Sequence, residues 1–306
     1  MSTPAHTPTM LRGADSSARP APADSSVRPA PTGSSARPAP AVPTAPGRSG
    51  GGSRSGFTSL LAAEAIKLRR SSAWVIAVLL PLLAVITGTV NFIMNRSSLH
   101  QGWVSLTSQI TLFYSMMFCS LGVALLASTV WRVEHRGTSW NAMRTTPHSP
   151  TAVALAKTLV ILVPVLAMQV VLLALTWLAG AIIAGLGPAI PIAFVASSLL
   201  ATLGALPLVA LQSLLSMLMR SFAAPVALAF VGCVIAFGLM LRQSIVSYAV
   251  PQGILNRTLM LGSSALDYAG DLTLSSFLPI MVAITVTGAV LWGLLALVSR
   301  RTGGAR

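Results

Sequence analysis

The sequence predicts an all-α membrane protein that crosses the bilayer six times, and three observations support this class. Of the 306 residues, 54% are hydrophobic and only 8% are charged, whereas about 25% of residues are charged in an average globular domain. Six apolar stretches are long enough to span about 30 Å of hydrocarbon at about 1.5 Å per residue. Basic residues gather on one side of these stretches. A chain with so few charges cannot cover a large water-exposed surface, so most of it belongs in lipid.

The first 56 residues differ from the rest in composition. They are rich in Ala, Pro, Ser and Gly, carry six arginines and contain almost no large apolar residue, so we expect a disordered tail. A nine-residue unit occurs three times, beginning at Asp15, Asp24 and Gly33. Pro-rich and then Gly-rich sequence favours polyproline II segments followed by flexible coil. The arginines leave open a second interpretation, a basic arm on anionic lipid.

The membrane domain is expected to comprise residues 57–306. It would begin with an interfacial helix at 57–71, and its spans lie at about 73–93, 110–130, 159–183, 190–218, 224–241 and 277–298. The first span lacks a cleavage pattern, so we expect it to be retained rather than removed as a signal peptide. Eleven Lys and Arg residues after residue 56 fall on one side, against Arg96, Arg242 and Arg257 on the other. Short cytoplasmic loops retain positive charge, so both termini are expected in the cytoplasm.

The spans contain no Asp, Glu, Lys, Arg or His, which disfavours an ion-coupled carrier and a membrane-embedded enzyme. No GxxxxGK[ST] phosphate-binding loop occurs, so ATP is not bound by that route. Cys119 and Cys233 lie within apolar stretches and predict neither a disulfide framework nor a metal site. We therefore predict no catalytic residue, metal, cofactor or nucleic-acid partner for this chain. The most polar residues within the spans are Gln169 and Gln212, which favour interhelical hydrogen bonds or a place on the pathway.

An amphipathic helix is expected just before the first span. Phe57, Leu60, Leu61 and Leu68 share one face, and Glu64 falls in the middle of that face. A carboxylate there is costly unless it is paired. We expect Glu64 to pair with Lys67 one turn on, or with a basic residue of the segment 131–150, and the alternative is a solvated carboxylate.

The segment 131–150 extends the second span on its basic side. Gly137 is a plausible helix stop, and Thr138 or Ser139 could cap a short helix that runs through Arg144. Such a helix would expose Trp140, Met143 and Arg144, residue types that are enriched at protein interfaces. The segment therefore predicts a protein contact, with a merely solvated loop as the alternative.

These motifs occur in an order that resembles the type-2 permease subunits of ABC exporters. Glu64-x-x-Lys67-x-x-Arg70 precedes the first span, and Glu134-x-x-Gly137, then Pro147 with Ser149, and then Lys157 at the start of the third span follow it. The resemblance covers residues 57–306 and is strongest to permeases of bacterial lantibiotic-immunity and bacitracin-type transporters. The repeat-bearing tail is not part of that pattern.

The resemblance implies several further properties. Two permease chains would pair with two copies of a separate ATPase, which binds the ATP, and residues 131–150 would be the coupling helix, with Glu134, Gly137, Trp140 and Arg144 in the coupling loop. Residues 57–70, with Glu64 and Lys67, would lie along the inner leaflet, and the segment 242–275 would fold as short re-entrant helices. The expected function is the membrane pathway of an exporter in the bacterial plasma membrane. Its substrate would be amphipathic or peptide-like, with antibiotic export or immunity as one such role.

Two other classes stay open. A membrane scaffold or assembly protein would act through the basic tail rather than through transport. An enzyme would depend on Asp267 and Asp271, which are four residues apart and could share a helix face. A pair of carboxylates without a third ligand more often caps a solvated segment than binds a metal. The part of this segment at 254–261 is apolar enough to lie at the membrane interface.

Overall fold

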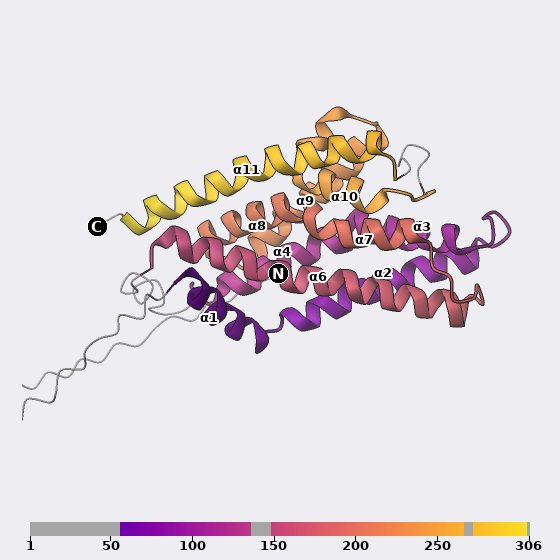
Figure 1. Cartoon of the computed structure of the whole chain (residues 1–306), viewed down its shortest axis with the longest axis horizontal. Coiled ribbons are helices and arrows are strands. Elements are labelled where there is room, and N and C mark those ends of the chain that lie inside the picture. The colour runs from indigo at the N-terminus through magenta and orange to yellow at the C-terminus, as the bar shows by residue number, and fades with distance from the viewer. Residues whose placement is uncertain (1–55, 136–147, 266–271, 305–306) are drawn as a thin grey trace, which may run out of the picture. The chain divides into compact units, whose positions relative to one another are not determined.

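The computed structural model describes residues 56–135, 148–265 and 272–304, and Figure 1 shows how their helices are arranged. Every regular element in these ranges is a helix, which confirms the all-α class. The N-terminal tail and residues 136–147 and 266–271 lie outside the described ranges. Expectations about Gly137, Trp140, Arg144, Asp267 and Asp271 therefore stay predictions.

Within the described ranges, six helical segments are long and apolar enough to cross a membrane, which confirms the number and order of the predicted spans. They are α2 (Ala73–Met94), α3 (Trp103–Phe113) continued by η1 (Tyr114–Phe118) and α4 (Cys119–Arg132), α6 (Pro150–Leu178) continued by η2 (Ala179–Ile183), α7 (Ile192–Gly204) followed by α8 (Leu206–Leu218), α9 (Ala223–Leu241) and α11 (Leu274–Gly304). A shorter helix, α1 (Phe57–Arg69), precedes them and matches the predicted interfacial helix.

The second and third spans begin earlier than the sequence predicted, at Trp103 and Pro150. The Thr107 hydroxyl donates to the Trp103 carbonyl at 2.8 Å, so the polar residues before 110 are accommodated within α3. At the start of α6 the Ser149 hydroxyl accepts the Ala152 N–H at 3.2 Å. Pro150, which has no N–H that needs a partner, fills the first helical position. Helix α6 consequently carries Lys157 about two turns from its start.

Three spans are not continuous α-helices. The segments η1 and η2 are π-helical, an irregularity that frequently marks functional sites. The fourth span breaks at Ala205, and Pro207 opens the following helix α8. Pro81 and Pro164, in contrast, lie inside α2 and α6. Of these three prolines, only Pro207 coincides with a break in the helix.

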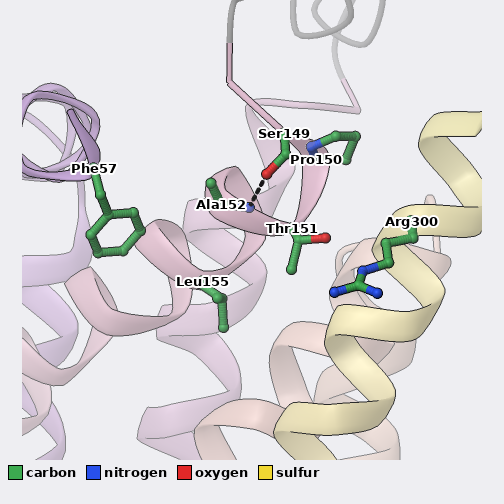
Figure 2. Close-up of a pocket in the computed structure, with 7 residues that line it drawn as sticks. All are labelled: Phe57, Ser149, Pro150, Thr151, Ala152, Leu155 and Arg300. Atoms are coloured by element: carbon green, nitrogen blue, oxygen red, sulfur yellow. Dashed lines mark hydrogen bonds between the residues drawn. The ribbon is translucent and has the colours of Figure 1, made fainter. Parts of the chain in front are cut away.

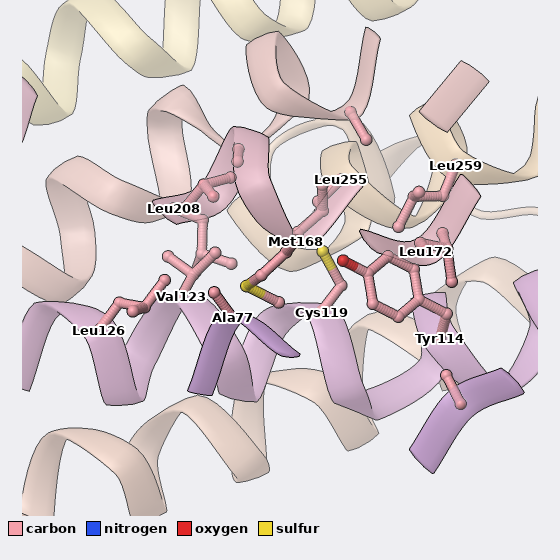
Figure 3. Close-up of a cluster of buried hydrophobic side chains, with 14 of the residues drawn as sticks. Ala77, Tyr114, Cys119, Val123, Leu126, Met168, Leu172, Leu208, Leu255 and Leu259 are labelled. Atoms are coloured by element: carbon pink, nitrogen blue, oxygen red, sulfur yellow. The ribbon is translucent and has the colours of Figure 1, made fainter. Parts of the chain in front are cut away.

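The main core lies where α2, α3, α4, α6 and α8 meet. Figure 3 shows Met168 of α6 among Cys119 and Val123 of the second span and Leu208 of α8. Close approach of helices depends on small residues. A Cβ atom on Gly88 of α2 would lie 2.5 Å from the Ile110 Cα atom of α3. Glycine at this position therefore sets how closely the first two spans pack.

The segment between α9 and α11 folds as two short helices, η3 (Ile245–Tyr248) and α10 (Pro251–Met260). Every residue of α10 except Arg257 is buried in the bundle, so the apolar residues of 254–260 pack against other helices. Helix α10 packs mainly on α7 and α9. Glycines on both helices make room for its side chains: Gln252 lies against Gly232, and Thr258 lies against Gly204.

The two ends of the bundle are identified by the residues that meet there. Phe57 of α1, Pro150 of α6 and Arg300 of α11 line one cavity, so the start of α1 and the end of α11 share one end, named the α1 end below. At the opposite end the Trp103 indole N–H donates to the Leu186 carbonyl at 3.0 Å. The described basic residues at the α1 end are Lys67, Arg69, Arg70, Arg132, Lys157, Arg220, Arg300 and Arg301.

Candidate functional site

Helix α1 presents an apolar face that contains one carboxylate. Its buried residues are Leu60, Glu64 and Leu68, spaced one turn apart, so Glu64 lies in the middle of the buried face as predicted, whereas Phe57 of the predicted face is exposed. Leu60 packs in a small cluster with Val153 and Ala156 of α6. This packing holds Glu64 against the first turns of the third span.

A buried lysine lies at the centre of the charged groups at this end. Lys157 of α6 is 1% exposed, and its ammonium nitrogen lies 2.7 Å from Glu64 Oε2 and 2.7 Å from Glu134 Oε1. Glu64 is itself 5% exposed, and its other oxygen lies 2.7 Å from the ammonium nitrogen of Lys67. The expected pair of Glu64 and Lys67 is thus present. These four residues are called the Lys157 cluster below.

The cluster is electrically balanced, since two carboxylates face two ammonium groups. Isolated charges are too costly to bury, and buried ion pairs persist only where geometry and hydrogen bonds compensate their desolvation. Lys157 has carboxylate partners at both contacts, whereas the side chain of Lys67 is 53% exposed and reaches water. Removing Lys157 would therefore leave Glu134 without its ion-pair partner, whereas removing Lys67 leaves both carboxylates paired with Lys157.

The environment of Glu64 favours its charged form. Burial raises the pKa of the Glu64 carboxyl, but the attraction of Lys157 and the hydrogen bonds from Lys157 and Lys67 outweigh burial and hold the pKa below its ordinary value of 4.5. Glu64 is consequently a carboxylate near neutral pH, which is the form that the two ammonium groups require.

Three separate elements meet at Lys157. Glu64 belongs to α1, and Glu134 lies just after α4, two residues before the segment 136–147 begins. Lys157 follows that segment on α6. The two ion pairs of Lys157 therefore tie the exit from the second span, the entrance to the third and helix α1 to one another.

Further contacts fix the exit from the second span. A ring nitrogen of His135, Nε2, lies 2.7 Å from the Ser216 carbonyl oxygen of α8. Because a carbonyl only accepts, this nitrogen is the donor. The guanidinium of Arg132 lies 5.4 Å from the centre of the Phe222 ring, ahead of α9. The predicted coupling loop therefore leaves the bundle from a fixed point, although Gly137, Trp140 and Arg144 themselves lie outside the described residues.

The two glutamines within the spans have different surroundings. The Gln169 amide of α6 donates to the Tyr114 hydroxyl of the π-helical segment η1 at 3.1 Å, which is an interhelical hydrogen bond of the predicted kind. Gln212 of α8 is fully buried, and within the described part of the chain neither atom of its amide has a hydrogen-bond partner. The structure thus brings Gln169, but not Gln212, into an interhelical contact.

The opposite end of the bundle carries a smaller polar group. The Arg257 guanidinium of α10 lies 4.2 Å from the centre of the Tyr248 ring, and its Nε donates to the Ser247 hydroxyl at 2.6 Å. These contacts join α10 to η3. Among the described residues, no group of three or more His, Cys, Asp or Glu side chains could hold a metal ion.

The sequence did not predict the ion pairs of Lys157. It placed this residue only at the start of the third span, on the basic side of the membrane. The position of Lys157 in the sequence could have indicated these ion pairs. Lys157 lies within an apolar helical stretch, and a buried ammonium group needs a carboxylate. Only four carboxylates follow residue 56, so the candidate partners were few. Which of them reach Lys157 depends on how α1 and the end of α4 fold back onto α6.

Comparison with known proteins identifies the family. Residues 60–236, more than half of the 306-residue chain, match the family described as ABC-2 family transporter protein. The match includes most of α1, the first four spans, most of α9 and the whole Lys157 cluster. No curated protein and no solved structure matches the chain.

Together, the fold and the family match define the class of this protein: it is a multi-pass helical membrane protein that serves as the permease of an ABC transporter. More specifically, the chain belongs to the ABC-2 transporter family. Permeases of this family are transmembrane subunits and are typically not themselves the ATPase, so the transporter includes a separate ATPase partner.

Proposed function

We propose that this permease forms the membrane pathway of an ATP-driven exporter and that the Lys157 cluster carries the movement of the ATPase into the spans. Residues 131–150 would dock on the ATPase as the coupling helix, with Glu134, Gly137, Trp140 and Arg144 in the coupling loop. Two permease chains would pair, and both termini would face the cytoplasm of a bacterial cell. The α1 end would then be the cytoplasmic end.

One observation carries this proposal: the Lys157 ammonium nitrogen lies 2.7 Å from a carboxylate oxygen of Glu64 in α1 and 2.7 Å from one of Glu134, which is two residues before the segment 136–147. A push on that segment moves Glu134 directly. Because the buried ammonium cannot lose a carboxylate without leaving an uncompensated charge, α1 and α6 would move with Glu134. The cluster would thus convert a local push into a joint movement of three elements.

The interior of the bundle favours an amphipathic or peptide-like substrate. Its buried polar groups between the two ends are mostly hydroxyls and amides, including Thr89, Ser120, Gln169 and Gln212. Such groups can accommodate peptide-like surfaces without binding a small ion tightly. The resemblance to lantibiotic-immunity and bacitracin-type permeases supports antibiotic export or immunity as the role.

The experiment is a co-purification of the tagged full-length chain under gentle detergent extraction, followed by identification of the ATPase and an assay of ATP hydrolysis. Trp140→Ala combined with Arg144→Ala should reduce association with the ATPase. Lys157→Gln should preserve association but reduce the response of ATP hydrolysis to transport substrate, since the contact surface remains while its connection to the spans is lost.

Lys67→Gln is the matched control, because Lys67 contacts the same carboxylate from a half-exposed position. This variant should retain coupling. Equal loss of coupling in Lys67→Gln and Lys157→Gln would show that the buried lysine has no special role in coupling. If no ATPase co-purifies with the unaltered chain, the proposed coupling fails altogether.

A further inference from the structure

A cavity of about 550 Å³ opens at the α1 end, between three helices. Figure 2 shows its lining residues: Phe57 belongs to α1, Thr151 and Leu155 to the first turns of α6, and Arg300 to the last turns of α11. The cavity does not include any residue of the Lys157 cluster. It is therefore a feature separate from the site described above.

The polar wall of the cavity is positive. Figure 2 shows the Arg300 guanidinium directed toward Thr151, and none of the described residues that line the cavity is a carboxylate. The ion pairs among the described residues use Lys67 and Lys157, and none of them uses Arg300. An arginine carries five N–H donors in a planar fork that matches the oxygens of a phosphate group. Arg300 is thus able to bind an anion inside the cavity.

Thr151 adds a second polar group on the facing wall. The neighbouring Ser149 hydroxyl accepts the Ala152 N–H at 3.2 Å, as the dashed line in Figure 2 shows, and so is already engaged in the helix start. The Thr151 hydroxyl has no such role among the described hydrogen bonds and faces the same space as Arg300. A phosphate oxygen can accept from both groups.

The remaining wall is apolar and close to the ends of the spans. Phe57 is 41% exposed, and Leu155 lies one turn along α6 from Thr151. The cavity also lies at the end of the bundle that holds eight of the described basic residues. An amphipathic anion with a phosphate head and an apolar body fits both walls, whereas a fully water-soluble anion leaves the phenyl ring without a contact.

We propose that this cavity binds an anionic phospholipid, with its phosphate on Arg300 and Thr151 and its glycerol and upper acyl region on Phe57 and Leu155. Bound there, the lipid joins α1, α6 and α11. Basic pockets between membrane helices bind anionic headgroups through the same chemistry. Zwitterionic headgroups are disfavoured, because their ammonium groups would find no carboxylate among the described lining residues.

Native mass spectrometry of the full-length chain in mixed micelles tests the proposal, with phosphatidylglycerol and phosphatidylcholine supplied at equal concentration. The chain should retain phosphatidylglycerol preferentially. Arg300→Gln should lower this retention about fivefold, and Thr151→Val should lower it in the same direction. Arg301→Gln is the matched control, because Arg301 is the adjacent arginine and does not line the cavity; it should change retention less than about twofold.

Two further measurements distinguish a lipid phosphate from free inorganic phosphate as the bound group. Phe57→Ala should weaken phosphatidylglycerol binding, and millimolar inorganic phosphate should not displace the lipid. Complete displacement by inorganic phosphate, together with unchanged binding in Phe57→Ala, would overturn the lipid assignment in favour of a soluble phosphate. Equal losses in Arg300→Gln and Arg301→Gln would show diffuse attraction to the basic end, and so would overturn the site. Equal retention of the two lipids by the unaltered chain would overturn it as well.

Discussion

Replacing Lys157 by Met removes the centre of the Lys157 cluster while nearly preserving side-chain length. Glu64 keeps Lys67, but Glu134 loses the only ion-pair partner that it has among the described residues, and both carboxylates stay buried. Breaking a buried pair from one side costs about 3–5 kcal/mol, because the remaining charge is uncompensated. Lys67→Met removes a half-exposed partner and should cost about 0–1 kcal/mol.

The assay is equilibrium unfolding of the purified chain in mixed micelles, followed by circular dichroism. Adding Glu134→Gln to Lys157→Met should restore at least about 1 kcal/mol of the free energy of unfolding, because it removes the carboxylate charge that Lys157→Met leaves unpaired. The Lys67→Met variant gives the baseline for losing an ammonium group at the same end. A cost for Lys157→Met no larger than that of Lys67→Met would refute the argument that burial makes Lys157 essential.

Four other predictions use the same unfolding measurement. The pKa of Glu64 is lowered in the folded state, so the charged carboxylate stabilises the fold fully above about pH 4.5, and this stabilisation is lost as the pH falls through the lower folded pKa. Glu64→Gln should remove this loss of stability in acid. A loss that is unchanged in the variant would come from other groups. Gln169→Leu should lower the free energy of unfolding by about 1–3 kcal/mol, since it leaves the tyrosine hydroxyl without its donor. Gln212→Leu should leave that free energy unchanged or raise it, because its amide has no partner in the described part of the chain, and a large loss would reveal a hidden contact. Gly88→Ala should cost about 1–3 kcal/mol more than Gly293→Ala, whose new methyl group meets nothing within 4 Å; equal costs would show that the first two spans can separate freely.

The sequence predicted the membrane spans well, because each depends on local properties. An apolar run of about 20 residues has to satisfy its backbone hydrogen bonds internally, and only a helix does so in lipid. The spans were therefore visible in order and number. Their boundaries were less accurate, as at Trp103 and Pro150, because polar residues can extend a helix when their own hydrogen bonds are met.

The candidate site was predicted only in part. The position of Glu64 on the apolar face and its contact with Lys67 follow from helical spacing within one short element. The partners from other elements did not follow, since Lys157 and Glu134 are separated from Glu64 by 93 and 70 residues respectively. Helix α10 illustrates the same limit: its apolar composition did not reveal which helices it meets, whereas in the structure Gly204 and Gly232 make room for its side chains.

The sequence by itself thus determined the all-α membrane class, the number of spans, the basic end of the bundle and the face on which Glu64 lies, because all four depend on composition and short spacings. Only the tertiary structure decided that Lys157 is buried between two carboxylates, that α10 is inserted in the bundle, and that Arg300 faces Thr151 across a cavity. Each of these contacts joins residues far apart in the chain. Their formation depends on how helices pack, and a periodic pattern within one helix carries no information about the neighbour that it meets.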